Sequence, residues 1–525
     1  MLSNMPSHTK DVHIKAITPI PYTLYHGTFI HTPSLDKLEI LFDTIVGVNS
    51  NGIIDYIYKD YNPSDHEGQS ALEYFLTQQN SNNNNDTEVK FIDVSHDYTK
   101  FFFPGFIDTH IHASQFPNIG IGLDTPLLDW LNKYTFPLEN QFCGDQETAK
   151  KKLEFARQVY TKVIQRTLSN GTTCASYFTT IDSETTNYFA ELLLEFGQRG
   201  FVGKVCMDCN DTYHQYEESL EECVESMNKI IDHLDDINPK LECLVKPIIT
   251  PRFAPVCSRE MLTYLGDLSL SKNLPIQTHI SENKSEIELV AKLFPDCANY
   301  SQVYNKYNLL TNSTILAHCI HLTPQECQLI AEKKCSVSHC PTSNTFISSG
   351  EAPIRKYLYD YKINVSLGTD VSGGFDSSIL HIIKHAILVS HHLSMKKEVK
   401  DAPSTDCKLS MTEGLYMSTM GGAKAVGLQD QIGSFAKGKK FDCQLIDLTT
   451  EGASTDVFPW QVPNTKQNEE EVVDDVIRYN KMVDLVCKWV FSGDDRNCVG
   501  VWCNGRQVVG KQGQQVKMER LNGGI

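Results

Sequence analysis

The sequence predicts an α/β protein, a TIM-like (β/α)8 barrel joined to a small β-sandwich domain that is built from both ends of the chain. Two observations lead to this prediction. Between residues 101 and 430, short apolar runs alternate with longer amphipathic segments. At both ends of the chain strand patterns replace this alternation, which is typical of termini that pair into one β domain. A doubly wound open sheet is the structural alternative.

The N-terminal part of the predicted β domain covers residues 1–100. Its apolar runs, at about 23–58, are interrupted by Asn51-Gly52. This dipeptide favours a hairpin turn because both turn positions need a positive φ. The tract QNSNNNNDT at 79–87 cannot bury apolar surface, so we expect a low-complexity loop there whose deletion leaves activity intact.

The barrel is predicted over residues 101–430, with eight strands that we assign to FFFPGFIDTHIH, TTCASYFT, FVGKVCMD, LECLVKPIIT, PIQTHI, TILAHCIHL, SVSHCPTSN and NVSLGTD. The first connecting segment repeats apolar side chains at helical spacing and is ended by Gly171; these side chains are Ala156, Val159, Tyr160, Val163, Ile164, Thr167 and Leu168. Thr323-Pro324-Gln325-Glu326 combines a capping box with proline at the first helical position, which predicts a helix start.

The C-terminal part of the predicted β domain covers residues 431–525. Its strand runs include the hairpin dipeptide Asn504-Gly505. A polar insert at about 449–498 separates these runs, and its segment 466–491 is predicted to be a surface helix with an acidic, solvated face.

Charge and composition exclude several classes of function. The 525 residues carry 47 Lys and Arg against 65 Asp and Glu, a net charge of −18. This balance argues against nucleic acid and against an anionic membrane as partners. No apolar run approaches the ~18 residues of a membrane span. Without a signal core at the N-terminus, we expect a cytoplasmic protein whose 17 cysteines, the Cys206–Cys209 pair included, are reduced thiols.

Candidate metal ligands fall at the ends of several predicted strands. His110 and His112 end the first strand, and side chains at i and i+2 point to the same side. His279, His318 and Asp370 occupy later strand ends, where the loops of a barrel converge. Each residue alone has a structural explanation, as a core histidine or a helix cap, but their common placement favours a metal site. Four other histidines fit the pattern less well and are expected to be structural: His321, His339, His381 and His385.

The motifs PGFIDTHIH, QTHISEN, AHCIHL, HCPTSN and SLGTDVSGG resemble the amidohydrolase superfamily, in its single-metal deaminase and chlorohydrolase branch. The resemblance covers nearly the whole chain. More locally, THIHASQFPNIG, KPIITPRFAP and QTHISEN are similar to the guanine deaminase family. The resemblance implies hydrolysis of guanine to xanthine and ammonia in purine catabolism or salvage, and a homodimer.

By this resemblance one Zn²⁺ is held by four residues: His110, His112, His279 and Asp370. Fe²⁺ and Mn²⁺ also accept such ligands. In binuclear relatives a bridging lysine or glutamate follows strand four, but here Thr250-Pro251-Arg252-Phe253 ends that strand and Lys246 lies inside it. A single ion is therefore expected.

The resemblance also implies roles in catalysis and binding. Glu282 is expected to shuttle protons, His318 to orient the attacking water, and Asp370 to accept a proton. Gln115 and Arg252 are expected to bind the purine edge. The complete set of expected substrate contacts is His112, Gln115, Arg252, Phe253, His279, Glu282 and Asp370.

Two alternatives to a guanine deaminase remain. A sister amidohydrolase would deaminate or dechlorinate another heterocycle, and a substrate panel distinguishes it. A non-catalytic amidohydrolase-fold scaffold would be expected to lack its metal ligands, whereas all the candidate ligands and Glu282 are present in this chain.

Overall fold

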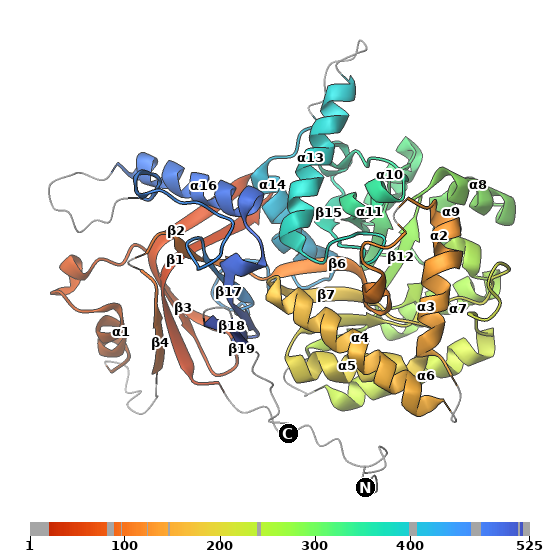
Figure 1. The fold of residues 1–525 in the computed structure, drawn as a ribbon, viewed down its shortest axis with the longest axis horizontal. Helices are drawn as coiled ribbons and strands as arrows, with labels where there is room; N and C mark the ends of the chain where they lie inside the picture. Colours follow the sequence, from red (N-terminus) through yellow and green to blue (C-terminus); the bar gives the residue numbers. More distant parts are fainter. Residues whose placement is uncertain are drawn as a thin grey trace, which may run out of the picture.

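The computed structural model (Figure 1) describes residues 20–80, 89–95, 97–122, 124–144, 148–238, 243–397, 407–463, 474–512 and 515–517. It contains a mostly antiparallel sheet on one side and parallel strands surrounded by helices on the other. The α/β class predicted from the sequence is therefore confirmed. Within the described ranges, no helix is both long enough and apolar enough to span a bilayer.

Parallel strands form the centre of the helical part. One sheet has the order β10-β8-β7-β6 and another the order β12-β13-β14-β15, with a short β11-β9 pair between them. Their bounds are β6 Phe106–His112, β7 Thr172–Phe178, β8 Arg199–Gly203, β9 Val205–Cys206, β10 Val245–Pro247, β11 Thr250–Pro251, β12 Ile276–Ile280, β13 Thr314–His318, β14 Ser336–His339 and β15 Asn364–Leu367. The spatial order follows the chain order without the reversal of a doubly wound sheet, so that alternative is disfavoured.

Backbone hydrogen bonds link these groups of strands. The Gln277 N–H donates to Ile249 O at 2.9 Å, which connects the strand after β10 to β12. The Asp370 N–H donates to His110 O at 2.8 Å and the His112 N–H to Val371 O at 3.1 Å, which connects the end of β15 to the end of β6. The ladders in the described residues do not form one continuous closed sheet, but the first and last strands meet where the candidate ligands lie.

Helices cover the outside of the parallel strands (Figure 1). They include α4 Ala149–Ser169, α5 Ser183–Phe196, α6 Leu220–Ile237, α7 Arg259–Lys272, α8 Lys284–Leu293, α10 Pro324–Glu332 and α13 Ile379–Lys397. The apolar face predicted for α4 is buried, and the chain leaves this helix through Gly171 at a φ of +83°. The predicted start of α10 is confirmed, because Thr323 and Glu326 form its capping box.

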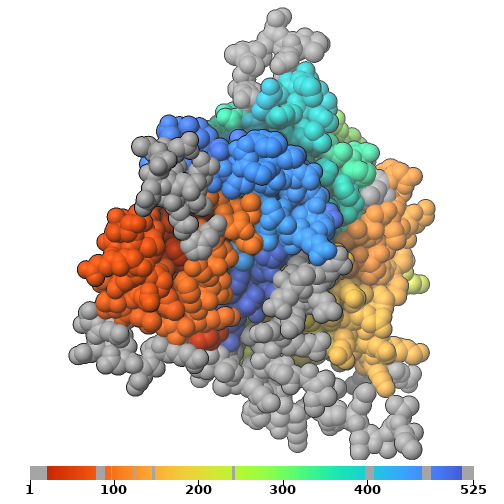
Figure 2. Space-filling model, turned by 60° about the vertical axis from the view of Figure 1, so that its left-hand side comes forward, coloured from red at the N-terminus to blue at the C-terminus, as the bar shows by residue number. Residues whose placement is uncertain are grey.

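Both ends of the chain contribute to one nine-stranded sheet. Its order is β19-β18-β17-β16-β5-β1-β2-β3, with β4 paired to β1. The bounds are β1 Tyr22–Ser34, β2 Lys37–Val48, β3 Ile54–Tyr58, β4 Val89–Asp93, β5 Lys100–Pro104, β16 Cys443–Asp447, β17 Cys498–Cys503, β18 Arg506–Gln512 and β19 Gln515–Lys517. Figure 2 shows N-terminal and C-terminal segments side by side on one face. The described strands form one sheet, so the sandwich of two sheets stays a prediction.

Several predicted strand boundaries were wrong. FVGKVCMD contains residues of two strands, β8 and β9, and LECLVKPIIT contains β10 and the first residue of β11. FFFPGFIDTHIH is two strands, β5 and β6, because at Gly105 the chain passes from the terminal sheet, where β5 pairs with β16, to the parallel strands, where β6 pairs with β7. TILAHCIHL ends as a strand at His318, where φ becomes positive (+68°). In SVSHCPTSN, Pro341 begins helix α11 (Pro341–Phe346), because proline is favoured in a first helical turn.

The two predicted irregular segments are only partly described. The low-complexity tract at 79–87 begins inside helix α1, Ala71–Asn80, and its remainder lies outside the described residues. Within the predicted insert at 449–498, the expected helix is present as α16, Asp475–Ser492, and residues 464–473 lie outside the described residues.

Candidate metal centre and active site

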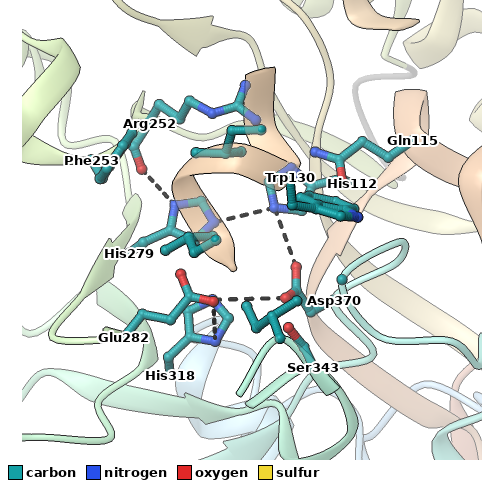
Figure 3. Close-up of a pocket in the computed structure, with 14 residues that line it drawn as sticks. His112, Gln115, Trp130, Arg252, Phe253, His279, Glu282, His318, Ser343 and Asp370 are labelled. Carbon is teal, nitrogen blue, oxygen red and sulfur yellow. Dashed lines mark hydrogen bonds and ion pairs between the residues drawn. The ribbon is translucent and has the colours of Figure 1, made fainter. Parts of the chain in front are cut away.

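The ends of β6, β12, β13 and β15 bring four side chains into one buried cluster, of which Figure 3 shows His279, His318 and Asp370. One potential ligand atom from each of His110, His279, His318 and Asp370 lies within 4.8 Å of those of the other three. His110 Nε2 lies 3.2 Å from Asp370 Oδ1. His112 Nε2 lies 3.4 Å from the same oxygen and 3.2 Å from His279 Nε2. The structure thus brings together all four predicted metal ligands and adds His318.

Partners outside the cluster orient two of the imidazoles. His279 Nδ1 lies 2.5 Å from Arg252 O, and because a carbonyl only accepts, Nδ1 carries the proton. His318 Nδ1 lies 2.9 Å from Asn344 Oδ1 in the same relation. Both rings then direct an unprotonated Nε2 into the cluster, which is how outer partners prepare histidine ligands.

The donor set fits a divalent metal ion. The Nε2 atoms of His110 and His318 are buried and have no hydrogen-bond partner. Burial lowers the pKa of His110, His112 and His279, which keeps these imidazoles in the neutral form that binds metal. Burial alone would raise the pKa of Asp370, but the adjacent His110 imidazole holds it below its usual range. Neutral imidazoles beside an ionised carboxylate suit Zn²⁺, Fe²⁺ or Mn²⁺.

Asp108 lies next to the cluster and holds the backbone that carries two of its members, although the sequence analysis did not select this residue. Its carboxylate accepts from Thr369 Oγ1 at 2.6 Å, from Thr369 N at 3.1 Å and from His110 N at 3.2 Å. Burial raises the pKa of Asp108 to about 7. The side chain ties the turn before Asp370 to the strand that carries His110.

Glu282 lies just after β12, with its carboxylate 3.6 Å from His318 Nδ1. It is 4% exposed, and burial followed by the charges of Asp370 and Glu286 raises its pKa well above the usual carboxyl value. Glu286 fixes this loop, because its Oε2 accepts from Glu282 N at 2.9 Å and from Asn283 N at 3.1 Å as part of the α8 capping box. A buried carboxyl of raised pKa beside a metal-type cluster is suited to proton transfer.

The predicted substrate residues lie above the cluster in the same cavity (Figure 3). Gln115 comes from the short 3-10 segment Ala113–Asn118, and Arg252 and Phe253 follow β11. All three are buried. Leu127, Trp130, Leu131, Ser343 and Ile347 complete much of the wall. The cavity therefore combines an apolar wall with polar and charged groups that converge on the metal-type cluster.

Glu139 is the main functional residue that the sequence analysis missed. It ends the short helix α3, Phe136–Glu139, and is 0% exposed. Its carboxylate accepts from Arg252 Nη1 at 2.6 Å and from Gln115 Nε2 at 2.8 Å. The signal available in the sequence was one acidic residue in the largely apolar segment YTFPLENQF.

The other histidines lie outside the cluster. His321 Nε2 lies 2.7 Å from Ser349 O, and His381 Nδ1 lies 2.5 Å from Asp376 Oδ2. His339 is buried in β14, and burial lowers its pKa to about 3. Half-burial also lowers the pKa of His385, which contacts the Phe375 ring.

A buried histidine and aspartate cluster at the carboxyl ends of parallel strands, with a buried carboxyl of raised pKa beside it, is typical of metal-dependent hydrolases with an α/β, TIM-like fold. Residues 101–508 match the model of the amidohydrolase family.

Comparison with named relatives identifies a more specific group within this family. A "probable guanine deaminase" of Schizosaccharomyces pombe is 44% identical over 510 residues, which cover 96% of this chain and 85% of that protein. The guanine deaminase of Homo sapiens is 37% identical and covers 93% of this chain and 96% of its own length. A crystal structure of guanine deaminase from C. acetobutylicum, with guanine bound in its active site, has a TM-score of 0.74 at 32% identity and covers 93% of this chain and 99% of its own. The chain belongs to the amidohydrolase family and, within it, to the guanine deaminases.

Proposed function

We propose that this protein hydrolyses guanine to xanthine and ammonia. The observation that carries the proposal is that a metal-type cluster and a buried Arg252–Gln115 pair converge on one cavity. The names of the relatives support the choice of substrate, since a relative of similar fold holds guanine in its active site.

Substrate recognition in this proposal depends on hydrogen bonds. Arg252 and Gln115 form hydrogen bonds with O6 and the adjoining ring-nitrogen edge of guanine, and Phe253 packs against the ring. His112, His279, Glu282 and Asp370 border the reacting carbon, C2. An analogue that leaves the polar groups of a buried pocket unpaired is discriminated against by a factor of ~10⁴ in kcat/KM.

The metal ligands are proposed to be His110, His112, His279 and Asp370, with His318 beside them. A divalent ion bound there supplies Lewis acidity, which lowers the pKa of water to about 7. His318 and Asp370 orient the attacking water. The Glu282 carboxyl would take one proton from that water and pass it to N3 of the purine. The second proton, left on the oxygen that has added to C2, would then pass through Glu282 to the amino group, which departs as ammonia. The raised pKa of Glu282 suits both transfers.

The ion is proposed to be a single Zn²⁺, and Fe²⁺ or Mn²⁺ are the alternatives that the same ligands accept. Elemental analysis of the purified protein identifies the ion. About one zinc per chain supports the proposal, whereas protein without bound metal supports the scaffold alternative.

The experiment that tests the function measures ammonia released from guanine by the metal-loaded protein. We expect turnover that a chelator abolishes and that added Zn²⁺ restores. A panel with adenosine, a pterin, a triazine and cytosine serves as the comparison. Turnover of one of these without turnover of guanine would refute the substrate assignment and favour a sister amidohydrolase.

We also propose a homodimer located in the cytoplasm, with one β-sandwich domain formed by residues 1–100 and 431–525 beside a barrel over 101–430. The antiparallel bridge between Ile53 and Lys440, one residue from each terminal segment, supports a shared terminal domain. Light scattering tests the dimer, microscopy of a fluorescent fusion tests the location, and limited proteolysis tests the domain boundaries.

A further inference from the structure

Glu139 connects the two residues proposed to recognise the purine. Its Oε2 accepts from Arg252 Nη1 at 2.6 Å, and its Oε1 accepts from Gln115 Nε2 at 2.8 Å and from Arg252 Nη2 at 3.4 Å. Glu139 is 0% exposed, and Arg252 and Gln115 are each 2% exposed. One carboxylate thus organises two side chains that are 137 positions apart in the sequence.

We propose that Glu139 is a positioning residue that orders Arg252 and Gln115 and neutralises the charge of Arg252, so that the pocket selects a neutral purine over an anionic one. This inference rests on the proposed function, because it assumes that guanine is the substrate and xanthine the product. Guanine is neutral near neutral pH, whereas xanthine is a weak acid that readily ionises in mild alkali.

The orientation of Gln115 follows from the chemistry of its partner. An ionised carboxylate only accepts hydrogen bonds, so the Gln115 group that faces Glu139 is the NH₂ and not the carbonyl. The Gln115 Oε1 accepts weakly from Ser372 N, at 3.4 Å. Glu139 therefore determines which end of the amide is available to the cavity.

The charge of the pocket follows from the ion pair. Arginine stays protonated, and the aromatic ring of Phe136, 5.1 Å from the guanidinium carbon, carries no formal charge. The nearby Tyr216 is uncharged as well. Burial and the Glu139 carboxylate raise the pKa of Tyr216, which keeps its hydroxyl protonated. Without Glu139, a buried and unpaired cation would attract anionic ligands.

The test is Glu139→Gln, which keeps the shape but removes the charge. The amide NH₂ takes the place of one carboxylate oxygen, so a donor of Arg252 or Gln115 loses its acceptor and faces another donor. We expect the KM for guanine to rise at least tenfold, with a smaller change in kcat, since a hydrogen bond to a charged group is worth about that factor or more. In mildly alkaline buffer, the ratio of the xanthine inhibition constant to the guanine KM should fall at least tenfold.

Two further variants make the result decisive. Glu326→Gln changes another buried glutamate, which caps α10 through Thr323 and does not line the cavity, so it controls for loss of a buried carboxylate. Glu139→Asp keeps the charge on a shorter side chain, so it should weaken guanine and xanthine in parallel and keep their ratio. If Glu139→Gln fails to fold, Glu139→Asp still tests the charge, because a changed ratio in that variant overturns the proposal.

Failure of this inference and failure of the proposed function have different signatures. If the wild-type protein releases ammonia from guanine but Glu139→Gln shifts guanine and xanthine equally, only the role of Glu139 is wrong. If the metal-loaded wild-type protein does not turn over guanine, the proposed function is wrong and the inference is refuted with it.

Discussion

At the scale of single residues, Glu282 combines burial with nearby negative charge. Both raise its pKa, and the carboxyl lies beside His318 rather than in solvent. These conditions are the ones that prepare a carboxyl to give and take protons near neutral pH.

Replacing Glu282 with Gln should remove proton transfer and leave the shape of the site. We expect kcat for guanine to fall by about 10² to 10⁴, the usual contribution of a general acid or base. Stopped-time ammonia assays measure the loss, while metal content and the melting temperature control for folding. A variant with full metal content and near wild-type kcat would show that another group moves the proton.

At the scale of elements, helix α8 holds the Glu282 loop through its capping box. Glu286 is 0% exposed and accepts from the backbone of Glu282 and Asn283 and from Tyr300 OH, at 2.8 Å for the last. These contacts link the start of a helix to the position of the proposed proton shuttle.

Glu286→Ala should therefore reduce both stability and activity. Leaving two backbone N–H groups and a buried hydroxyl without their acceptor should lower the free energy of unfolding by about 2 kcal/mol or more. Urea unfolding measures the stability. Because the Glu282 loop loses its anchor, kcat should fall as well, and a stable variant with unchanged kcat would contradict this coupling.

Strand β1 contains a buried histidine, His31, whose protonation should change the stability of the terminal sheet. His31 is 4% exposed, its Nδ1 accepts from Phe435 N at 3.2 Å, and its Nε2 lies 2.8 Å from Glu39 Oε2. Burial lowers the pKa of His31 to about 4, although Glu39 acts in the opposite direction. Protonation of His31 would place a hydrogen on its Nδ1, which could then no longer accept the hydrogen bond from Phe435 N–H.

Since the folded pKa lies below the unfolded value of about 6.5, the stabilisation is present above pH ~6.5 and is lost as the pH falls towards 4. The loss amounts to about 3 kcal/mol over that window. Unfolding experiments across this range should show the decline, and His31→Gln should flatten it. Parallel curves for the two proteins would mean that His31 is already protonated in the fold.

At the scale of the whole molecule, a buried ion pair joins the parallel strands to the terminal sheet. Arg199 in β8 donates from Nε and Nη2 to the two oxygens of Asp442, both at 3.2 Å, and Asn504 N donates to Asp442 at 2.7 Å. Arg199 and Asp442 are each 4% exposed, so neither charge has a solvent alternative.

Asp442→Asn should leave a buried guanidinium without its counter-charge. Breaking one partner of such a pair costs about 3–5 kcal/mol, which thermal or denaturant unfolding detects. The metal cluster lies at the opposite, carboxyl ends of the strands, so the folded fraction should keep its metal and its KM for guanine. A change in KM with unchanged stability would contradict this separation of roles.

The parts of the site that the sequence revealed are those with a local signature. His110 and His112 alternate along one strand, and His279, His318 and Asp370 end others, so knowing the strands was enough to bring them together. Glu139 has no such signature, because α3 is one turn long and lies between the strand that carries the first histidines and the next.

The sequence by itself determined three features: the alternation of strands and helices, the strand segments towards both termini, and the strands whose last residues are candidate ligands. These features depend on side-chain periodicity and capping within a few residues. Only the tertiary structure decided the break at Gly105 and the contact of Glu139 with Arg252. Each of these depends on which distant backbones and side chains pack together, and the free energy of that packing is shared across the whole core rather than encoded in one segment.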